Sequence, residues 1–161
     1  MSRELMVRVA DLKAGSGEDI LVTLGLGSCV AILLFDNESK VGGLAHILLP
    51  SRSLSRGTEN PAKFPQSAVP ALVAEMSLLG AIPGRLTARL VGGASMFAGL
   101  APPGSIQMGE RNLVATREVL NSQGIPVIGE SVGGDFGRSV RFHVRLNRIE
   151  IKSVAHGEQL L

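Results

Sequence analysis

The chain is poor in cysteine and in aromatic residues: its 161 residues include one cysteine, five phenylalanines and neither tryptophan nor tyrosine. A single thiol, Cys29, excludes an internal disulfide and any zinc or iron–sulfur site built from several cysteines. The scarcity of rings argues against a binder of single-stranded nucleic acid and against an aromatic cage, because both need stacking surfaces. The lone cysteine is therefore the residue to explain.

The chain also lacks a charge excess and a long hydrophobic run. Its 16 basic and 14 acidic residues leave a net charge of +2, which argues against phosphate-backbone binding as the main role. Charges near the N-terminus argue against a signal peptide, and the longest uncharged stretch, residues 20–35, is too short to span a bilayer. We expect a cytoplasmic protein whose residues 1–161 form one domain, because 45% apolar residues can fill one core.

Apolar runs separated by glycine-rich turns predict a mixed α/β (α+β) domain. Helices are expected over residues 67–79 and 110–122, with Ser67 as the cap of the first and Pro70 in its first turn. Because several strands are joined as hairpins, the sheets are not expected to be purely parallel. The expected strands before the C-terminal hairpin are residues 20–24, 30–35, 41–49, 86–90 and 125–128.

The C-terminal hairpin, with its turn at residues 147–148, shows the clearest alternation in the sequence. Every second residue is apolar, which predicts one buried face made by Val140, Phe142, Val144 and Leu146. The basic residues predict a solvated face, with docking to an acidic partner as a second use; they are Arg138, Arg141, Arg145, Arg148 and Lys152. His143 and His156 lack metal-ligand spacing to His46 and are interpreted as ordinary surface or hairpin residues.

Cys29 follows the turn Gly25-Leu26-Gly27-Ser28, and two interpretations of it are open. Free cysteines are commonly small buried hydrophobes. A glycine turn can instead aim backbone N–H groups at an anion, as an oxyanion hole requires. On the second interpretation, the backbone at Gly27 and Ser28, next to the thiol, supplies the donors.

The hairpin that follows brings a histidine toward the thiol. If Asn37-Glu38 forms its tip, Asp36 pairs with Ser39, and Cys29 then lies directly opposite His46. Opposed side chains are close enough for an imidazole to take a thiol proton. A loop of three or five residues would shift this register. Without a cysteine partner, His46 would be interpreted as a core histidine.

Thr23 lies just before the glycine turn. Its hydroxyl is placed to accept a hydrogen bond from the second imidazole nitrogen and so to fix the tautomer, although spacing alone favours an ordinary β-branched strand residue. Together Cys29, His46 and Thr23 predict a triad in which the thiolate is the nucleophile. Such a thiol is expected to have a pKa below the ordinary value of about 8.5.

Five segments, in order, resemble the CheD-type chemoreceptor glutamine deamidases: VTLGLGSCVAILL, VGGLAHILLP, GGASMF, MGERN and GGDFGRSV. The resemblance extends over about residues 20–140. It implies a layered sandwich of mixed β-sheets flanked by helices, similar to the deamidating toxin-type cysteine hydrolases. It also implies that Cys29, His46 and Thr23 are catalytic, and that no metal or organic cofactor is needed.

The resemblance implies a substrate and partners as well. The substrate would be the side-chain amide of selected glutamines on methyl-accepting chemotaxis receptors, hydrolysed through a cysteine thioester with release of ammonia. Some relatives are credited with receptor methylesterase activity, and a CheC-type phosphatase is a further implied partner. The alternative from another class is a non-catalytic adaptor that binds the phosphatase or the receptor, with Cys29 buried and inert.

Substrate contacts are expected in the loops. The polar loop over residues 50–65 and the GGASMF turn are the natural places for a receptor helix to touch, and the candidates are Ser95, Met96, Phe97 and Phe64. Phe64 stands where relatives often carry tyrosine, and residues 98–107 form a longer segment than is usual in the family. A hydroxyl-dependent role at position 64 is therefore not expected, and the longer segment is expected to alter the rim of the substrate groove.

Overall fold

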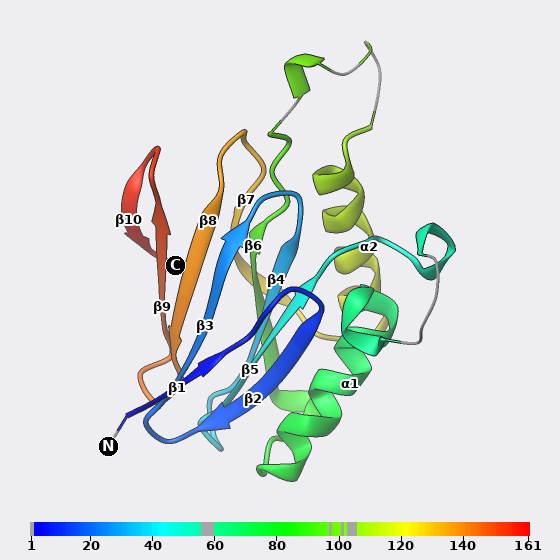
Figure 1. Cartoon of the computed structure of the whole chain (residues 1–161). Helices are drawn as coiled ribbons and strands as arrows, with labels where there is room; N and C mark the ends of the chain where they lie inside the picture. The colour runs from blue at the N-terminus through cyan, green and yellow to red at the C-terminus, as the bar shows by residue number, and fades with distance from the viewer. Residues whose placement is uncertain (1, 56–59, 97, 101, 103–105) are drawn as a thin grey trace.

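The computed structural model describes residues 2–55, 60–96, 98–100, 102 and 106–161. These residues form two five-stranded sheets packed face to face, with two helices on the outer side of one sheet (Figure 1). The mixed α/β sandwich flanked by helices that the sequence analysis expects is confirmed.

The first sheet contains both chain termini and has its outer face free of helices (Figure 1). Its strands, in spatial order, are β1 (Arg3–Met6), β3 (Asp19–Leu26), β8 (Arg138–His143), β9 (Arg148–Ser153) and β10 (Gly157–Leu160). The β1–β3 pair is parallel and the other pairs are antiparallel.

The second sheet holds the hairpin that the sequence analysis singles out. Its strands, in spatial order, are β2 (Asp11–Ser16), β5 (Val41–Ile47), β4 (Val30–Asp36), β6 (Leu86–Gly92) and β7 (Val127–Val132). The β6–β7 pair is parallel and the other pairs are antiparallel. Both sheets are therefore mixed.

The helices α1 (Pro65–Leu78) and α2 (Met108–Ser122) cover the outer face of the second sheet (Figure 1). Short 3-10 turns occur at Arg52–Leu54, Pro61–Lys63, Pro83–Arg85 and Ala98–Leu100. The expected start of α1 was wrong, because Phe64 occupies the N-cap position and Pro65 is the first helical residue, a position that proline favours. Pro70 consequently lies inside the helix, and the Ser67 hydroxyl donates to the Pro61 carbonyl oxygen instead of capping.

The core has two layers, and β4 separates them. All seven residues of β4 are buried, as its uninterrupted apolarity predicts for a central strand. Ile32 and Leu34 pack toward the helices, whereas Leu33 and Phe35 pack in the layer between the two sheets. Cys29 belongs to this inter-sheet layer, so the thiol lies between the sheets.

The expected register of the β4–β5 hairpin was wrong by two residues. Asp36 pairs with Val41, and His46 therefore pairs with Ala31 instead of with Cys29. The turn has four residues, Asn37 to Lys40; the Asp36 carbonyl oxygen accepts the Lys40 N–H at 2.9 Å, and Lys40 has a φ of 56°. A two-residue turn favours glycine or asparagine at both central positions, and Glu38 does not meet that demand.

The C-terminal hairpin keeps its predicted alternation but not all of its predicted faces. β8 ends at His143, and Leu146 in the following turn is 61% exposed rather than buried. Arg138 shares the inward face with Val140 and is buried against the ring of Phe136. The basic face is also largely neutralised, because Arg141, Arg145 and Lys152 pair with Glu4, Glu18 and Glu158.

Three strands were missed, and one was shifted. β1, β2 and β10 lie at sheet edges, where short strands carry many polar residues and little alternation. The strand expected over residues 125–128 begins at Val127 and continues to Val132 as the polar edge strand β7. No helix within the described ranges is long and apolar enough to cross a membrane.

The buried Asp36 carboxylate holds both the hairpin turn and the Pro83–Arg85 turn. It accepts hydrogen bonds from the N–H groups of Glu38 and Ile82 and pairs with Arg85 at 2.9 Å, contacts that hold its pKa well below the usual range. We expect Asp36→Ala to lower the free energy of unfolding by about 3 kcal/mol, because the N–H groups of Ile82 and Glu38 lose their acceptor and Arg85 loses its charged partner. Urea unfolding measures this change.

The matched control is Glu38→Ala. Glu38 contacts the same arginine at 2.6 Å, but its side chain is 70% exposed. An exposed pair contributes at most about 1 kcal/mol. Equal losses in the two variants would show that burial of Asp36 does not matter.

Candidate active site

Thr23 and His46 meet across the interface between the two sheets. Thr23 lies on β3 of the first sheet and His46 on β5 of the second, and both are completely buried. The Thr23 Oγ1 and His46 Nδ1 atoms are 2.7 Å apart. Thr23 Oγ1 also donates to the carbonyl oxygen of Val7 at 2.6 Å.

The two hydrogen bonds of Thr23 Oγ1, to Val7 and to His46, define the tautomer of His46. A threonine hydroxyl has one hydrogen, and the Val7 carbonyl oxygen, which can only accept, takes it. The Thr23 oxygen must then accept from His46 Nδ1, which places the imidazole hydrogen on Nδ1. The other nitrogen, Nε2, is left as an acceptor, and it is buried without a hydrogen-bond partner among the described residues.

Cys29 lies on the same side of the hairpin as His46, one pleat away. His46 pairs with Ala31, so Cys29, two residues before Ala31, is its diagonal neighbour rather than its direct partner. Its side chain is 9% exposed. The shift of two residues preserves the face, because side chains alternate with a period of two.

Burial keeps both groups neutral. It raises the pKa of the Cys29 thiol above its ordinary value, opposed by the backbone N–H of Cys29 itself, so the expected lowering of the thiol pKa was wrong. Burial also lowers the pKa of His46 to about 4. Near neutral pH the pair is therefore a thiol and an uncharged imidazole with a bare Nε2.

Three consecutive carbonyl groups of the loop before β4 are held by donors from other parts of the chain. The Gly27 and Cys29 oxygens accept the N–H groups of Ala94 and Gly93, at 2.9 and 2.8 Å. The Ser28 oxygen accepts from Asn112 Nδ2 at 2.9 Å. Because C=O and N–H point in opposite directions across a planar trans peptide, this arrangement also defines where the intervening N–H groups point.

Close backbone approach makes these contacts possible. Gly92 has a φ of 110°, and a Cβ atom there would lie 2.3 Å from the Cys29 carbonyl oxygen. At the start of α2, a Cβ atom on Gly109 would lie 2.4 Å from the Ala94 carbonyl oxygen. Glycine at these two positions therefore lets the β6 turn approach the cysteine loop, and lets the start of α2 approach that turn.

The expected substrate-contact residues separate into two groups. Met96 is 47% exposed, and a Cβ atom on Gly27 would lie 3.0 Å from its sulfur, so it borders the cysteine loop; Ser95 beside it is partly buried. Phe64 is only 3% exposed, because its ring packs at the start of α1, and the expectation that it forms a contact surface was wrong. Phe97 lies outside the described residues.

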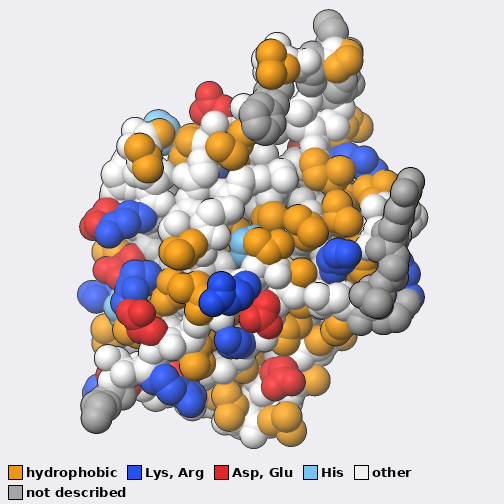
Figure 2. Space-filling view, viewed as in Figure 1, with side chains coloured by type: hydrophobic (Ala, Val, Ile, Leu, Met, Phe, Trp, Pro, Cys, Tyr) orange, Lys and Arg blue, Asp and Glu red, His pale blue; other side chains and the backbone are white. Residues whose placement is uncertain are grey.

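A largely apolar groove of about 730 Å³ runs beside the cysteine loop, lined in part by Leu24, Gly25, Met96, Phe136 and Val154. Hydrophobic side chains also gather across the middle of the face shown in Figure 2, over the ends of β3 and β5. Leu24 and Val9 are each more than half exposed. The loop thus opens onto an apolar surface that suits an amphipathic protein segment.

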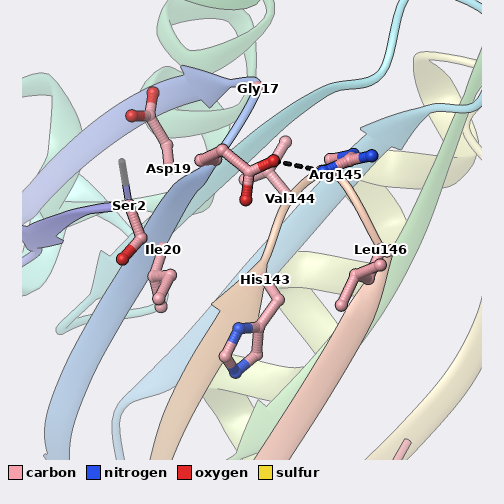
Figure 3. Close-up of a pocket in the computed structure, with 9 residues that line it drawn as sticks. Ser2, Gly17, Asp19, Ile20, His143, Val144, Arg145 and Leu146 are labelled. Carbon is pink, nitrogen blue, oxygen red and sulfur yellow. Dashed lines mark hydrogen bonds and ion pairs between the residues drawn. The ribbon is translucent and has the colours of Figure 1, made fainter.

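A second hollow lies at the other end of β3 and does not belong to the site. Figure 3 shows Asp19, Ile20, His143 and Arg145 around it, between the β2–β3 and β8–β9 turns. Its charged groups are paired: Asp19 with Arg3, Arg145 with Glu18 and His143 with Glu150. Within the described ranges no group of three or more His, Cys, Asp and Glu side chains is arranged to hold a metal ion.

The residues that hold the cysteine loop and Thr23 from outside are not marked by the sequence patterns that select Cys29, His46 and Thr23. Val7 supplies only a carbonyl group, which no pattern marks, and Gly93 and Ala94 supply only N–H groups. Asn112 lies in the quoted MGERN segment, where it received no role. A polar residue on the buried face of an otherwise amphipathic helix was the available signal.

Comparison with known proteins places relatives over nearly the whole chain. The family model described as CheD chemotactic sensory transduction matches residues 48–153. A probable chemoreceptor glutamine deamidase CheD of Caldanaerobacter subterraneus subsp. tengcongensis is 42% identical over 156 residues, covering 97% of this chain and 96% of that protein. A protein of the same description from Desulfitobacterium hafniense is 40% identical over 161 residues, the full length of both.

Among solved structures, protein NMB0706 of Neisseria meningitidis matches with a TM-score of 0.48 and 12% sequence identity, over 81% of this chain and 62% of that one.

The neutral, buried state of His46 predicts an acid-sensitive stability. Its pKa is about 4 in the folded chain and about 6.5 in an unfolded one, so between these values the unfolded chain binds one more proton. Stability is fully present above pH 6.5 and falls as the pH drops toward 4, by about 3 kcal/mol. Urea unfolding at several pH values measures this slope, and His46→Asn should flatten it; parallel curves for both proteins would contradict it.

The raised pKa of Cys29 predicts slow alkylation of the free protein. The rate of reaction with iodoacetamide should still be rising above pH 8.5, because only the thiolate reacts. Alkylation in urea, where the thiol is solvated, provides the reference titration near the ordinary value of about 8.5. A midpoint lower in the folded protein than in urea would mean that a thiolate–imidazolium pair already exists without substrate.

Proposed function

Because this chain belongs to the CheD chemotactic sensory transduction family, we propose that it is a protein-glutamine deamidase. It hydrolyses the side-chain amide of chemoreceptor glutamines to glutamate and ammonia, with Cys29 as nucleophile, His46 as general base and acid, and Thr23 as the residue that orients His46. The relatives described as chemoreceptor glutamine deamidases support the substrate class. The hydrogen bonds that link His46 to Thr23, and Thr23 to the Val7 carbonyl group, support the assignment of His46 as base and acid.

The single observation that carries this proposal is the bare, buried Nε2 of His46. An imidazole held through Nδ1 with Nε2 free is prepared to accept a proton. Cys29 lies one pleat away on the same face, and Gly25, in the turn that precedes it, lines an apolar groove. A structural histidine of the core would have both nitrogens satisfied.

In the first half of the reaction, His46 Nε2 takes the Cys29 proton while the sulfur attacks the amide carbon. The carbonyl oxygen of the substrate becomes an oxyanion, for which the N–H groups of the Gly27–Cys29 loop are the donors. His46 then returns the proton to the departing nitrogen. The C–N bond breaks, ammonia leaves and a thioester on Cys29 remains.

In the second half, His46 Nε2 takes a proton from water, which attacks the thioester carbon. The C–S bond breaks, the sulfur regains a proton from His46, and the glutamate side chain is released. The balance is one amide and one water converted to one carboxylic acid and one ammonia. A methyl ester would follow the same path with methanol as the leaving group.

The neutral orienting residue suits the departure of ammonia. A carboxylate in place of Thr23 would stabilise the imidazolium and raise its pKa, whereas here burial keeps the pKa of His46 at about 4. Without a carboxylate at Nδ1, the imidazolium formed in the reaction gives its proton to the departing nitrogen more readily than a carboxylate-paired one would. Thr23 therefore directs the ring without holding the proton on it.

The partners follow from the same proposal. The protein meets cytoplasmic receptor helices through the groove beside Met96 and acts in the cytoplasm. A CheC-type phosphatase remains a prediction from the family resemblance.

Ammonia release from a purified chemoreceptor cytoplasmic domain tests the proposal. Cys29→Ala should abolish release while leaving receptor binding intact, because the side chain is small and buried. Thr23→Val, which keeps the shape but loses the bond to His46, should lower kcat roughly 10²-fold through a misoriented imidazole. Mass spectrometry of receptor peptides, which gain about 1 Da when glutamine becomes glutamate, identifies the sites.

Two results would contradict the proposal in different ways. If Cys29→Ala released ammonia at the wild-type rate, the nucleophile would be another group. If the wild-type protein bound the receptor tightly and released no ammonia, the chain would be a non-catalytic adaptor.

A further inference from the structure

Asn112 is a buried polar residue on the face of α2 that covers the cysteine loop. Its Nδ2 atom donates to two carbonyl oxygens, that of Ser28 at 2.9 Å and that of Leu48 at 3.2 Å. An amide nitrogen has two hydrogens, so its full donor capacity is used on these two groups. Both acceptors are backbone atoms next to the candidate catalytic residues: Ser28 precedes Cys29, and Leu48 follows His46 by two residues.

Asn112 is the side-chain member of the set of donors that holds the loop. The Gly27 and Cys29 carbonyl groups are held by backbone N–H groups of the β6 turn, whereas the Ser28 carbonyl group, between them, is held by Asn112. The Ser28 carbonyl group and the Cys29 N–H group belong to one planar peptide unit and point in opposite directions. Because Asn112 holds the Ser28 carbonyl group toward α2, the Cys29 N–H group points away from α2.

The Cys29 N–H group thus lies on the side of its peptide unit opposite to α2. The same N–H group opposes the effect of burial on the pKa of the Cys29 thiol. A donor next to the nucleophilic sulfur is where the oxyanion of a tetrahedral intermediate forms. Its direction, and with it the donor geometry, depends on the bond from Asn112 to Ser28.

Within the described part of the chain, Asn112 uses its donors fully and its acceptor not at all. Its Oδ1 atom is buried without a hydrogen-bond partner among the described residues, which is unfavourable for stability. A leucine there would remove this unpaired acceptor but would leave the Ser28 and Leu48 carbonyl groups without their Asn112 donor. Asn112 therefore serves two backbone groups beside the candidate catalytic residues while its own acceptor stays unpaired within the described ranges.

We propose that Asn112 is a positioning residue of the active site, which clamps the Ser28 and Leu48 carbonyl groups and so aims the Cys29 N–H group at the oxyanion. This inference rests on the proposed deamidase function for its catalytic consequence. The clamp joins the nucleophile loop to the strand that carries His46, so it holds the two halves of the reacting pair at one separation.

Asn112→Leu tests the inference, because it removes both donors and also the unpaired acceptor. We expect kcat for ammonia release from a chemoreceptor cytoplasmic domain to fall roughly 10²-fold with little change in KM, since substrate binding does not use Asn112. The thermal midpoint should fall modestly, because the Ser28 and Leu48 carbonyl groups lose their donor. The rate of Cys29 alkylation by iodoacetamide at pH 8 should fall, because a peptide that is no longer held stabilises the thiolate less well.

Thr116→Val is the matched control. Thr116 lies one turn further along the same buried face of α2, and its hydroxyl is likewise buried without a hydrogen-bond partner among the described residues. It makes no bond to the cysteine loop. The control should keep the wild-type kcat, KM and alkylation rate.

The outcomes separate this inference from the proposed function. Wild-type kcat and alkylation in Asn112→Leu, or an equal loss in Thr116→Val, would overturn the clamp. If the wild-type protein released no ammonia but alkylation slowed in Asn112→Leu alone, the clamp would stand and the deamidase proposal would fail. If the leucine variant does not fold, kcat and the alkylation rate are measured for Asn112→Ala instead, with the same expected results. If neither variant folds, Asn112 is structural and the inference is overturned.

Discussion

The hydrogen bond between Thr23 and His46 crosses from one sheet to the other, and the rest of the candidate site depends on it. It is 2.7 Å long and lies in the same layer as the apolar side chains that fill the space between the sheets, including Leu21, Leu44 and Phe142. Packed cores transmit small changes in volume. The inter-sheet core therefore does more than stabilise the fold, because its thickness determines where the imidazole of His46 lies.

The same burial sets the charge state of the pair before substrate arrives. It keeps Cys29 as a thiol and His46 uncharged, and Thr23 brings no charge that would reverse this. A permanent thiolate would react with many electrophiles, whereas a neutral thiol is much less reactive. On the proposed mechanism, Cys29 would therefore become reactive only when a substrate carbonyl is bound beside it.

The strands of the site could be predicted from the sequence, but the register could not. The apolar runs of β3, β4 and β5 and the glycine turn before Cys29 are local patterns, and they select Thr23, Cys29 and His46. The register depends on the turn, where the buried Asp36 carboxylate and the left-handed Lys40 favour four residues over two. The observed register differs from the expected one by two residues. Because side chains alternate with a period of two, this difference leaves Cys29 and His46 on the same face of the hairpin.

The remaining determinants of the site are contacts between residues far apart in the sequence, which no local pattern contains. Asn112 lies 84 residues from the Ser28 carbonyl group that it holds. The GGASMF segment contributes two N–H groups to the cysteine loop, and the GGDFGRSV segment in turn holds it, through Gly133 N–H to the Gly92 oxygen and Ser95 N–H to the Gly134 oxygen, each 2.9 Å. The segments that resemble the family therefore lie together around the cysteine loop, although they are far apart in the sequence. Since most of the bonds they make are between backbone groups, glycines that permit close approach, such as Gly92 and Gly109, matter there as much as the side chains that react.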